Sequence, residues 1–207
     1  MCIHCFLFYI HTHMPYRFTF KVDHETVFAG LLHSKRCTAT CNNGVQCRRH
    51  VVIGLPFCYS HLRYQKKLVI KPSTIQGGGK GLFACDLKSP DGVVFKVGDK
   101  LGQYYGERLN LEQLHARYGA DNTPPYALQV TKNLFIDPGL ERGFLSICNS
   151  KTSAAQCNAR FMSPNNNYEV SIAATKTIRH GDEIFVFYGP HTKQILASDS
   201  TTVMVRK

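Results

Sequence analysis

The sequence predicts a mostly β fold with one or two short helices, preceded by a small module rich in Cys and His. From Lys67 onward, short apolar runs alternate with Gly, Pro and Asn, which is the pattern of strands joined by turns. No run approaches the roughly 18 apolar residues of a membrane-spanning helix. Triplet periods and sustained heptads are also missing from the sequence. These observations favour one globular domain with a small appendage and exclude collagen-like, coiled-coil and integral membrane classes.

Four segments follow one another along the chain. Residues 1–33 mix aromatic, His and apolar residues without a period and lack the basic start of a secretory signal, so we expect a disordered extension. Residues 34–66 form the Cys/His module. Residues 67–190 form the β domain, and residues 191–207 form a polar tail.

Within the β domain, one helix and several short strands are expected. Apolar residues recur at helical spacing only in residues 109–118, with Asn110 as the expected N-cap. The expected strands are 68–70, 93–95, 101–105, 126–130, 134–136, 170–173 and 184–188.

Charge is distributed unevenly. The chain has 25 Lys and Arg against 14 Asp and Glu, a formal net charge of +11. Residues 1–70 hold nine basic and two acidic residues, so a contact with a polyanion is expected there. Basic side chains within residues 36–67 could contact nucleic acid, and a solvated rim is an equal alternative. They are Arg36, Arg48, Arg49, Arg63, Lys66 and Lys67.

The module has the ligand types of a zinc site. Cys37, Cys47, Cys58 and His61 stand as Cys-x9-Cys-x10-Cys-x2-His, and thiolate and imidazole are the ligands that tetrahedral zinc prefers. A segment this short has too little apolar area for its own core, so a metal would supply folding energy. We expect a structural zinc ion, with Cys41 as the alternative to Cys37.

Buried free thiols and disulfides are the alternatives to a metal site at these cysteines. Thiols pack well as small apolar groups, but the neighbouring residues 42–46 and 48–50 are polar or basic. Disulfides are disfavoured because no signal peptide is recognised. The arrangement also resembles a small zinc module with the elements Cys-x-Ala, Gly-x-x-Cys and Cys-x-x-His.

Residues 77–81 are Gly-Gly-Gly-Lys-Gly, a run that lets backbone come close to a ligand. Alone it is weak evidence, because a simple turn explains it and neither a Walker ending nor a βαβ pattern follows.

Three further motifs come later in the chain: 103–107, Cys148-Asn149 followed by Asn158-Ala159, and 181–189. Together with 79–84, these segments resemble the SET-domain protein lysine methyltransferases over residues 67–190, and 134–138 resembles that family's Ile-Asp-Ala strand.

This resemblance implies a fold of small sheets with a knot-like C-terminal passage, in which the Asn149 and Tyr188 segments lie side by side. It also implies S-adenosylmethionine as cofactor and a lysine side chain as methyl acceptor. The residues implied to contact the cofactor are Gly79, Lys80, Gly81, Asn149, Ser150 and Tyr188.

The resemblance further assigns Tyr188 and Tyr104 to catalysis, and Tyr104, Tyr126 and Val186 to the wall of a narrow substrate channel. Methyl transfer is an in-line displacement, so the enzyme mainly aligns donor and acceptor. A water-poor aromatic channel favours the neutral amine that attacks. Val186 occupies a position often held by Phe or Tyr, and its small size predicts multiple methylation.

Two departures weaken the resemblance. Ser146 and Ser150 stand where the family usually has Arg and His, and the family's three-cysteine segment after the domain is missing because no Cys follows Cys157. The alternative is a non-catalytic SET-like protein that binds chromatin or nucleic acid through its basic module.

We therefore expect a methyltransferase acting on a histone or another protein, in the nucleus or on chromatin and otherwise in the cytoplasm, without a membrane partner. A basic histone tail would be favoured if Glu107, Asp137 and Glu141 lined its groove.

Overall fold

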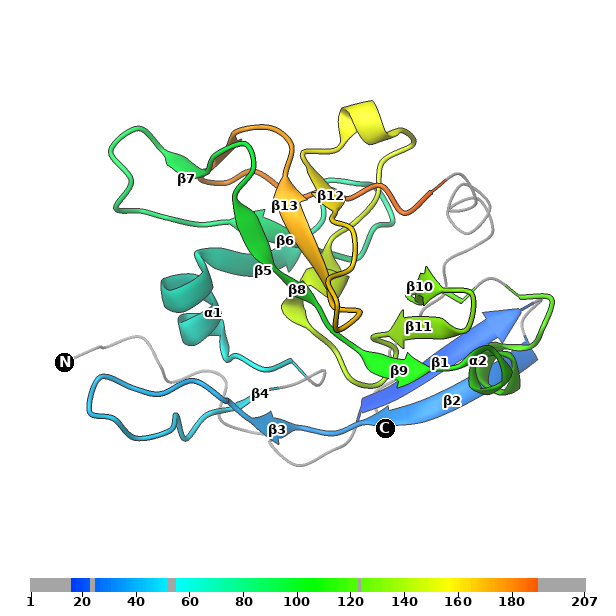
Figure 1. Cartoon of the computed structure of the whole chain (residues 1–207). Helices are drawn as coiled ribbons and strands as arrows, with labels where there is room; N and C mark the ends of the chain where they lie inside the picture. Colours follow the sequence, from blue (N-terminus) through cyan, green and yellow to red (C-terminus); the bar gives the residue numbers. More distant parts are fainter. Residues whose placement is uncertain (1–15, 23–24, 52–54, 123, 190–207) are drawn as a thin grey trace.

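The fold is mostly β in the computed structural model, which describes residues 16–22, 25–51, 55–122 and 124–189 (Figure 1). The predicted fold class, small sheets with few short helices and a small N-terminal Cys/His module, is confirmed. The helices are α1 (Tyr59–Lys66), α2 (Leu111–Tyr118) and two 3-10 helices, η1 (Phe144–Ile147) and η2 (Ala154–Gln156). In the described part of the chain, no helix has the length and apolarity needed to span a membrane.

The strands pair antiparallel in sheets of two or three. Two sheets have three strands, in the orders β12-β13-β8 and β10-β11-β9. The strands are β1 (Tyr16–Val22), β2 (Glu25–Leu32), β3 (Lys35–Arg36), β4 (His50–Val51), β5 (Leu68–Pro72), β6 (Lys80–Ala84), β7 (Val93–Phe95), β8 (Lys100–Tyr104), β9 (Glu107–Leu109), β10 (Leu128–Thr131), β11 (Leu134–Asp137), β12 (Ala159–Phe161), β13 (Val170–Ala174) and β14 (Ile178–Arg179).

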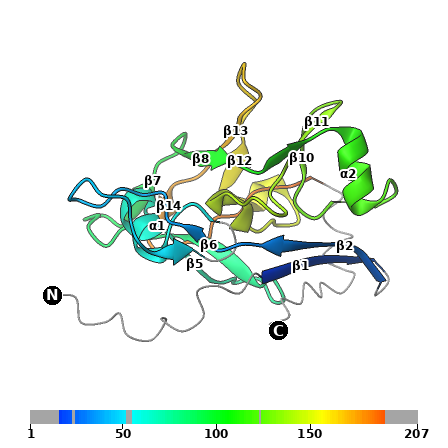
Figure 2. The same cartoon turned by 90° about the horizontal axis from the view of Figure 1, so that it is seen from below.

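The expected extension at residues 1–33 is wrong in its second half, because β1 and β2 form a hairpin there. Figures 1 and 2 both show this hairpin alongside α2. The rings of Phe20 and Phe28 lie 5.2 and 5.7 Å from the ring of Tyr118. A Cβ at Gly30 would lie 2.5 Å from Leu140 Cδ2, so the hairpin packs closely on the β domain. Its apolar residues find their partners about 90 residues later in the chain, which no local period reveals. Residues 1–15 and 190–207, including the expected polar tail, lie outside the described residues.

The two α-helices differ in how clearly the sequence encodes them. Asn110 accepts from Gln113 N–H and Gln113 Oε1 accepts from Asn110 N–H, a capping box that confirms the expected start of α2. The sequence analysis did not predict the helix α1. Only Leu62 is buried in it, so its apolar period is too weak to recognise.

Residues 183–186, near the end of the β domain, pair with three segments that are far from them in the sequence. Phe185 pairs with Asn149 and Val186 with Ala159, both in parallel, while Glu183 pairs with Phe83. These isolated bridges replace the regular strand expected at 184–188. The predicted neighbourhood of the Asn149 and Tyr188 segments is present, since Tyr188 Oη donates to Cys148 O at 2.9 Å.

Candidate functional site

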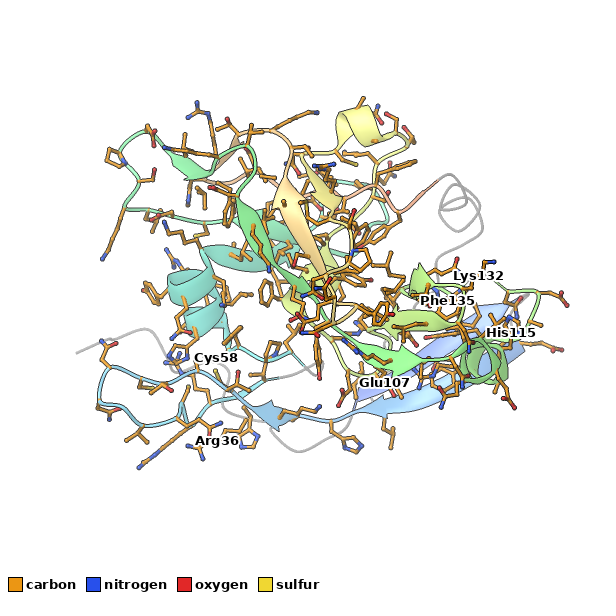
Figure 3. The ribbon with its side chains drawn as sticks, viewed as in Figure 1. Arg36, Cys58, Glu107, His115, Lys132 and Phe135 are labelled. Carbon is orange, nitrogen blue, oxygen red and sulfur yellow. The ribbon has the colours of Figure 1, made fainter. Side chains whose placement is uncertain are left out.

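The Cys/His module brings four metal-binding donors together. Cys37, Cys47 and Cys58 are buried, and their Sγ atoms and His61 all lie within 4.8 Å of one another. The first turn of α1 sets the Cys58 and His61 side chains on one side, with Cys58 Sγ 3.3 Å from His61 Nδ1. Figure 3 labels Cys58 at the start of this helix. Backbone N–H groups of Cys58 and Arg49 donate to Cys37 Sγ and Cys47 Sγ at 3.2 and 3.4 Å.

This donor set fits a tetrahedral zinc ion. Three sulfurs and one imidazole nitrogen at such separations match a closed Cys3His site. Burial raises the pKa of the Cys37 thiol, and a divalent cation would offset that cost by stabilising the thiolate. Cys41 is not one of the four, so the geometry favours Cys37 over Cys41 as a ligand.

In the β domain, Asn149 contacts the end of the glycine run. Its Nδ2 donates to Lys80 O, Ser73 Oγ and Glu183 Oε1, each at 3.0 Å. Gly79 accepts from Ser73 N–H at 2.9 Å and thereby closes the turn. Of the residues that the resemblance assigned to the cofactor, Gly79, Lys80 and Asn149 are thus linked in one network.

Glu183 is a buried member of this network that the sequence analysis left without a role. Its carboxylate accepts from Ser73 Oγ at 2.7 Å and from Thr74 N and Oγ1 at 2.7 and 2.6 Å, besides Asn149. Burial opposes ionisation, but the bonds from Thr74, Asn149 and Ser73 lower the Glu183 pKa below its usual value. A Cβ at Gly81 would collide with Glu183 Oε1, which explains glycine at this position. The only sequence signal was its place in the 181–189 motif.

Tyr188 and Ser150 lie together at the end of the passage. Tyr188 N–H donates to Ser150 Oγ at 3.3 Å, and Tyr188 Oη donates to Cys148 O. Burial raises the pKa of Tyr188 well above its usual value, so its hydroxyl stays protonated.

A row of three rings connects Tyr188 to the interior. The Tyr188 ring lies 5.6 Å from that of Phe161, which lies 5.2 Å from the ring of Tyr104. Tyr104 is only 1% exposed and donates its hydroxyl to Tyr126 O at 2.7 Å. The guanidinium of Arg142 lies 4.9 Å from the centre of the Tyr126 ring. The sequence analysis missed Phe161, because a phenylalanine within a short strand is usually a core residue.

Val186 is fully buried, and its N–H donates to Asn149 O at 2.9 Å. It therefore lies next to the network around Asn149. The channel formed by Tyr104, Tyr126 and Val186 stays a prediction.

Glu107, Asp137 and Glu141 do not form the free acidic groove that would favour a basic substrate. Arg117 donates to Glu107 at 2.8 and 3.1 Å and to Asp137 at 2.7 Å, while Lys35 pairs with Glu141 at 3.2 Å. Tyr118 also donates to Asp137, which is completely buried. All three carboxylates already have cationic partners within the chain.

Comparisons with known proteins give only weak likenesses. No family model and no curated protein matches the chain. Among solved structures, the Chaetomium thermophilum polycomb repressive complex 2 matches at 20% identity over 68% of this chain and 16% of that chain, with a TM-score of 0.47. The structure titled "ctPRC2 in an autoinhibited conformation bound to S-adenosylmethionine" matches at 21% identity over 62% and 16%, with a TM-score of 0.49.

A third, titled as an active polycomb repressive complex 2 in the stimulated state, matches at 20% identity over 66% and 16%, with a TM-score of 0.49. The chain thus spans about one sixth of the length of these matched chains. Likeness at this level is too weak to assign an activity to this chain.

Proposed function

We propose that the chain is a protein lysine N-methyltransferase that uses S-adenosylmethionine and acts on a histone or another protein, in the nucleus or on chromatin. The observation that supports this proposal is that motifs far apart in the sequence contact one another in the fold. Asn149 donates to Lys80 O, and Tyr188 contacts Cys148 and Ser150. These motifs are the ones that the resemblance assigns to the cofactor and to methyl transfer.

The polar groups around Asn149 suit the ammonium-bearing end of the cofactor. All three hydrogen bonds of the Asn149 side chain use Nδ2, and within the described residues none engages Oδ1. Oδ1 is therefore an acceptor for a ligand ammonium. When bound, S-adenosylmethionine supplies an electrophilic methyl group on a sulfonium.

The aromatic row around Tyr188 would favour the reactive form of the substrate amine. Tyr104, Phe161 and Tyr188 form a row of rings beside the proposed site, and removal of water by such apolar surface disfavours an ammonium. Tyr188 stays protonated and already donates to Cys148 O, so it orients the amine through its oxygen and does not act as a base. The amine proton then leaves to water before transfer.

We propose zinc as the occupant of the Cys37, Cys47, Cys58 and His61 cluster. The set has four protein ligands, which leaves no open position for catalysis, so the ion stabilises the module. This role is structural.

The test is transfer of labelled methyl from S-adenosylmethionine to core histones and cell extract, with mass spectrometry locating the label. We expect label on lysine, including dimethyl or trimethyl product because Val186 is small. A folded, zinc-loaded protein that transfers no label would contradict the enzyme and support the non-catalytic SET-like interaction protein.

A further inference from the structure

The Cys/His module has a surface that methyl transfer does not use. Residues 34–67 contain seven Lys or Arg and neither Asp nor Glu. Lys35 and Lys67 pair with carboxylates of the β domain, at Glu141 and Asp86. The other five cations leave the module with a net positive charge, to which a polyanion would be attracted.

A hollow of about 720 Å³ lies on this module beside the metal cluster. Asn42, Asn43, Tyr64 and Gln65 are among its lining residues, and none of the described lining residues is acidic. Asn43 Oδ1 accepts from Val45 N–H, and Gln65 Nε2 donates to Thr40 O at 3.4 Å, which leaves Asn43 Nδ2 and Gln65 Oε1 for a ligand. Side-chain amides both donate and accept, so they match the mixed hydrogen-bonding edge of a nucleobase. The volume lies within the range of about 300–1,000 Å³ typical of small-ligand sites.

The exposed Tyr64 of α1 adds ring surface to this hollow. It is 73% exposed, although it belongs to an ordered helix. The Arg63 guanidinium lies 5.8 Å from the centre of the Tyr64 ring. The Lys66 ammonium lies elsewhere, 5.2 Å from the centre of the Phe57 ring. The Arg63 cation and the exposed Tyr64 ring therefore lie together, and Tyr64 lines the hollow.

We propose that this surface binds single-stranded nucleic acid. A base stacks on Tyr64, the amides of Asn42, Asn43 and Gln65 contact its edge, and Arg63 contacts phosphate. Stacking on an aromatic ring next to a cation is the general way in which proteins hold single strands. An acidic peptide would use the cations but neither the exposed ring nor the amides, and the paired bases of a duplex cannot stack on a ring.

The experiment uses the full, zinc-loaded chain and fluorescence anisotropy of labelled oligo-uridine and oligo-thymidine of about 15 nucleotides, over a series of salt concentrations. Tyr64→Ala should raise the Kd about tenfold, because stacking of one base is lost. Arg63→Gln should reduce the slope of log K against log salt by about 0.7.

Matched controls come from the β domain. Tyr168→Ala removes another tyrosine that is 50% exposed, and Lys132→Gln removes an exposed cation that Figure 3 shows far from Cys58. Both should leave the Kd unchanged within twofold. The zinc content of every variant is also measured. A variant that keeps its zinc but binds the oligonucleotide more weakly has lost a surface contact and not the metal.

Three results would overturn the proposal. The first is the absence of saturable binding to either oligonucleotide. The second is equal competition by polyglutamate or by duplex DNA of the same charge, which would mean an unspecific polyanion site. The third is an equal effect of Tyr64→Ala and Tyr168→Ala. Methyl transfer by the same preparations is scored separately, so either conclusion can fail without the other.

Discussion

The metal cluster and the Glu183 network are both groups of polar side chains with buried members, but they are encoded differently. All four donors of the metal cluster fall within residues 37–61, and two of them share the first turn of one helix. Glu183 instead lies 110 residues from Ser73 and 34 from Asn149. Local spacing therefore reveals the first group, whereas only the completed fold brings the second together. We propose that a metal ion holds the first group together, whereas the hydrogen bonds described above hold the second.

The largest effect is expected where the metal is removed. Cys58→Ser should lower the Tm by about 10 °C or more, because structural zinc supplies folding energy that a short module lacks. Cys37, Cys47 and Cys58 belong to the same core cluster as Leu68 of the β domain, so the loss should spread beyond the module.

Cys41→Ser is the matched control, since Cys41 lies outside the four donors. It should keep one zinc per chain and a Tm close to that of the parent, by metal analysis and thermal unfolding. Loss of zinc in Cys41→Ser, with retention in Cys37→Ser, would show that the assigned ligand is wrong.

A smaller effect on stability is expected when the hydrogen-bond network around Glu183 is weakened. Glu183→Gln should lower the free energy of unfolding by about 1–3 kcal/mol, because an amide nitrogen replaces an acceptor that faces several donors. Glu169→Gln, at a carboxylate that accepts from Asn165, should change it by less than about 0.5 kcal/mol in urea unfolding.

In acid, the parent and Glu183→Gln should lose stability to different extents. The folded pKa of Glu183 is lowered, so its contribution to stability is present above its usual pKa of about 4.5 and is lost as pH falls through the folded value. Between pH 5 and the acid limit of folding, the parent should therefore lose more stability than Glu183→Gln does. Parallel curves for the two proteins would show that Glu183 is not held in its ionised form.

The smallest expected effect tests the N-terminal hairpin. Phe28→Ala should cost about 1–2 kcal/mol, since a half-buried ring against Tyr118 is removed. Val27→Ala, at the exposed neighbouring position, is the control. Equal Tm values for the two variants would mean that the hairpin contributes nothing to the stability of the β domain.

The sequence predicted those features whose cause is local. Asn110 as a cap, the Cys58 and His61 pair, and the alternation of strands with turns all depend on residues close together in the chain. The family resemblance added the neighbourhood of Asn149 and Tyr188, which no local rule gives.

The features that escaped prediction depend on distant partners. The hairpin of residues 16–32 packs on Tyr118, the 183–188 segment pairs with Phe83, Asn149 and Ala159, and Glu141 pairs with Lys35. In each case the deciding contact joins residues that are far apart in the sequence, so no local pattern contains it. The roles assigned to Tyr104, Tyr126 and Val186 stay predictions, because position alone does not establish a substrate channel.

The most direct test of the proposed activity compares Tyr188→Phe with Tyr105→Phe in the methyl-transfer assay. Tyr188 contacts the Asn149 segment, whereas Tyr105 is 51% exposed and its hydroxyl contacts Glu141. We predict label on lysine with the parent and with Tyr105→Phe, and a fall of at least about 100-fold with Tyr188→Phe, as for loss of one positioned hydroxyl in a water-poor site. Equal transfer by the two variants, in proteins that are equally folded, would contradict the assignment of the active site to Tyr188.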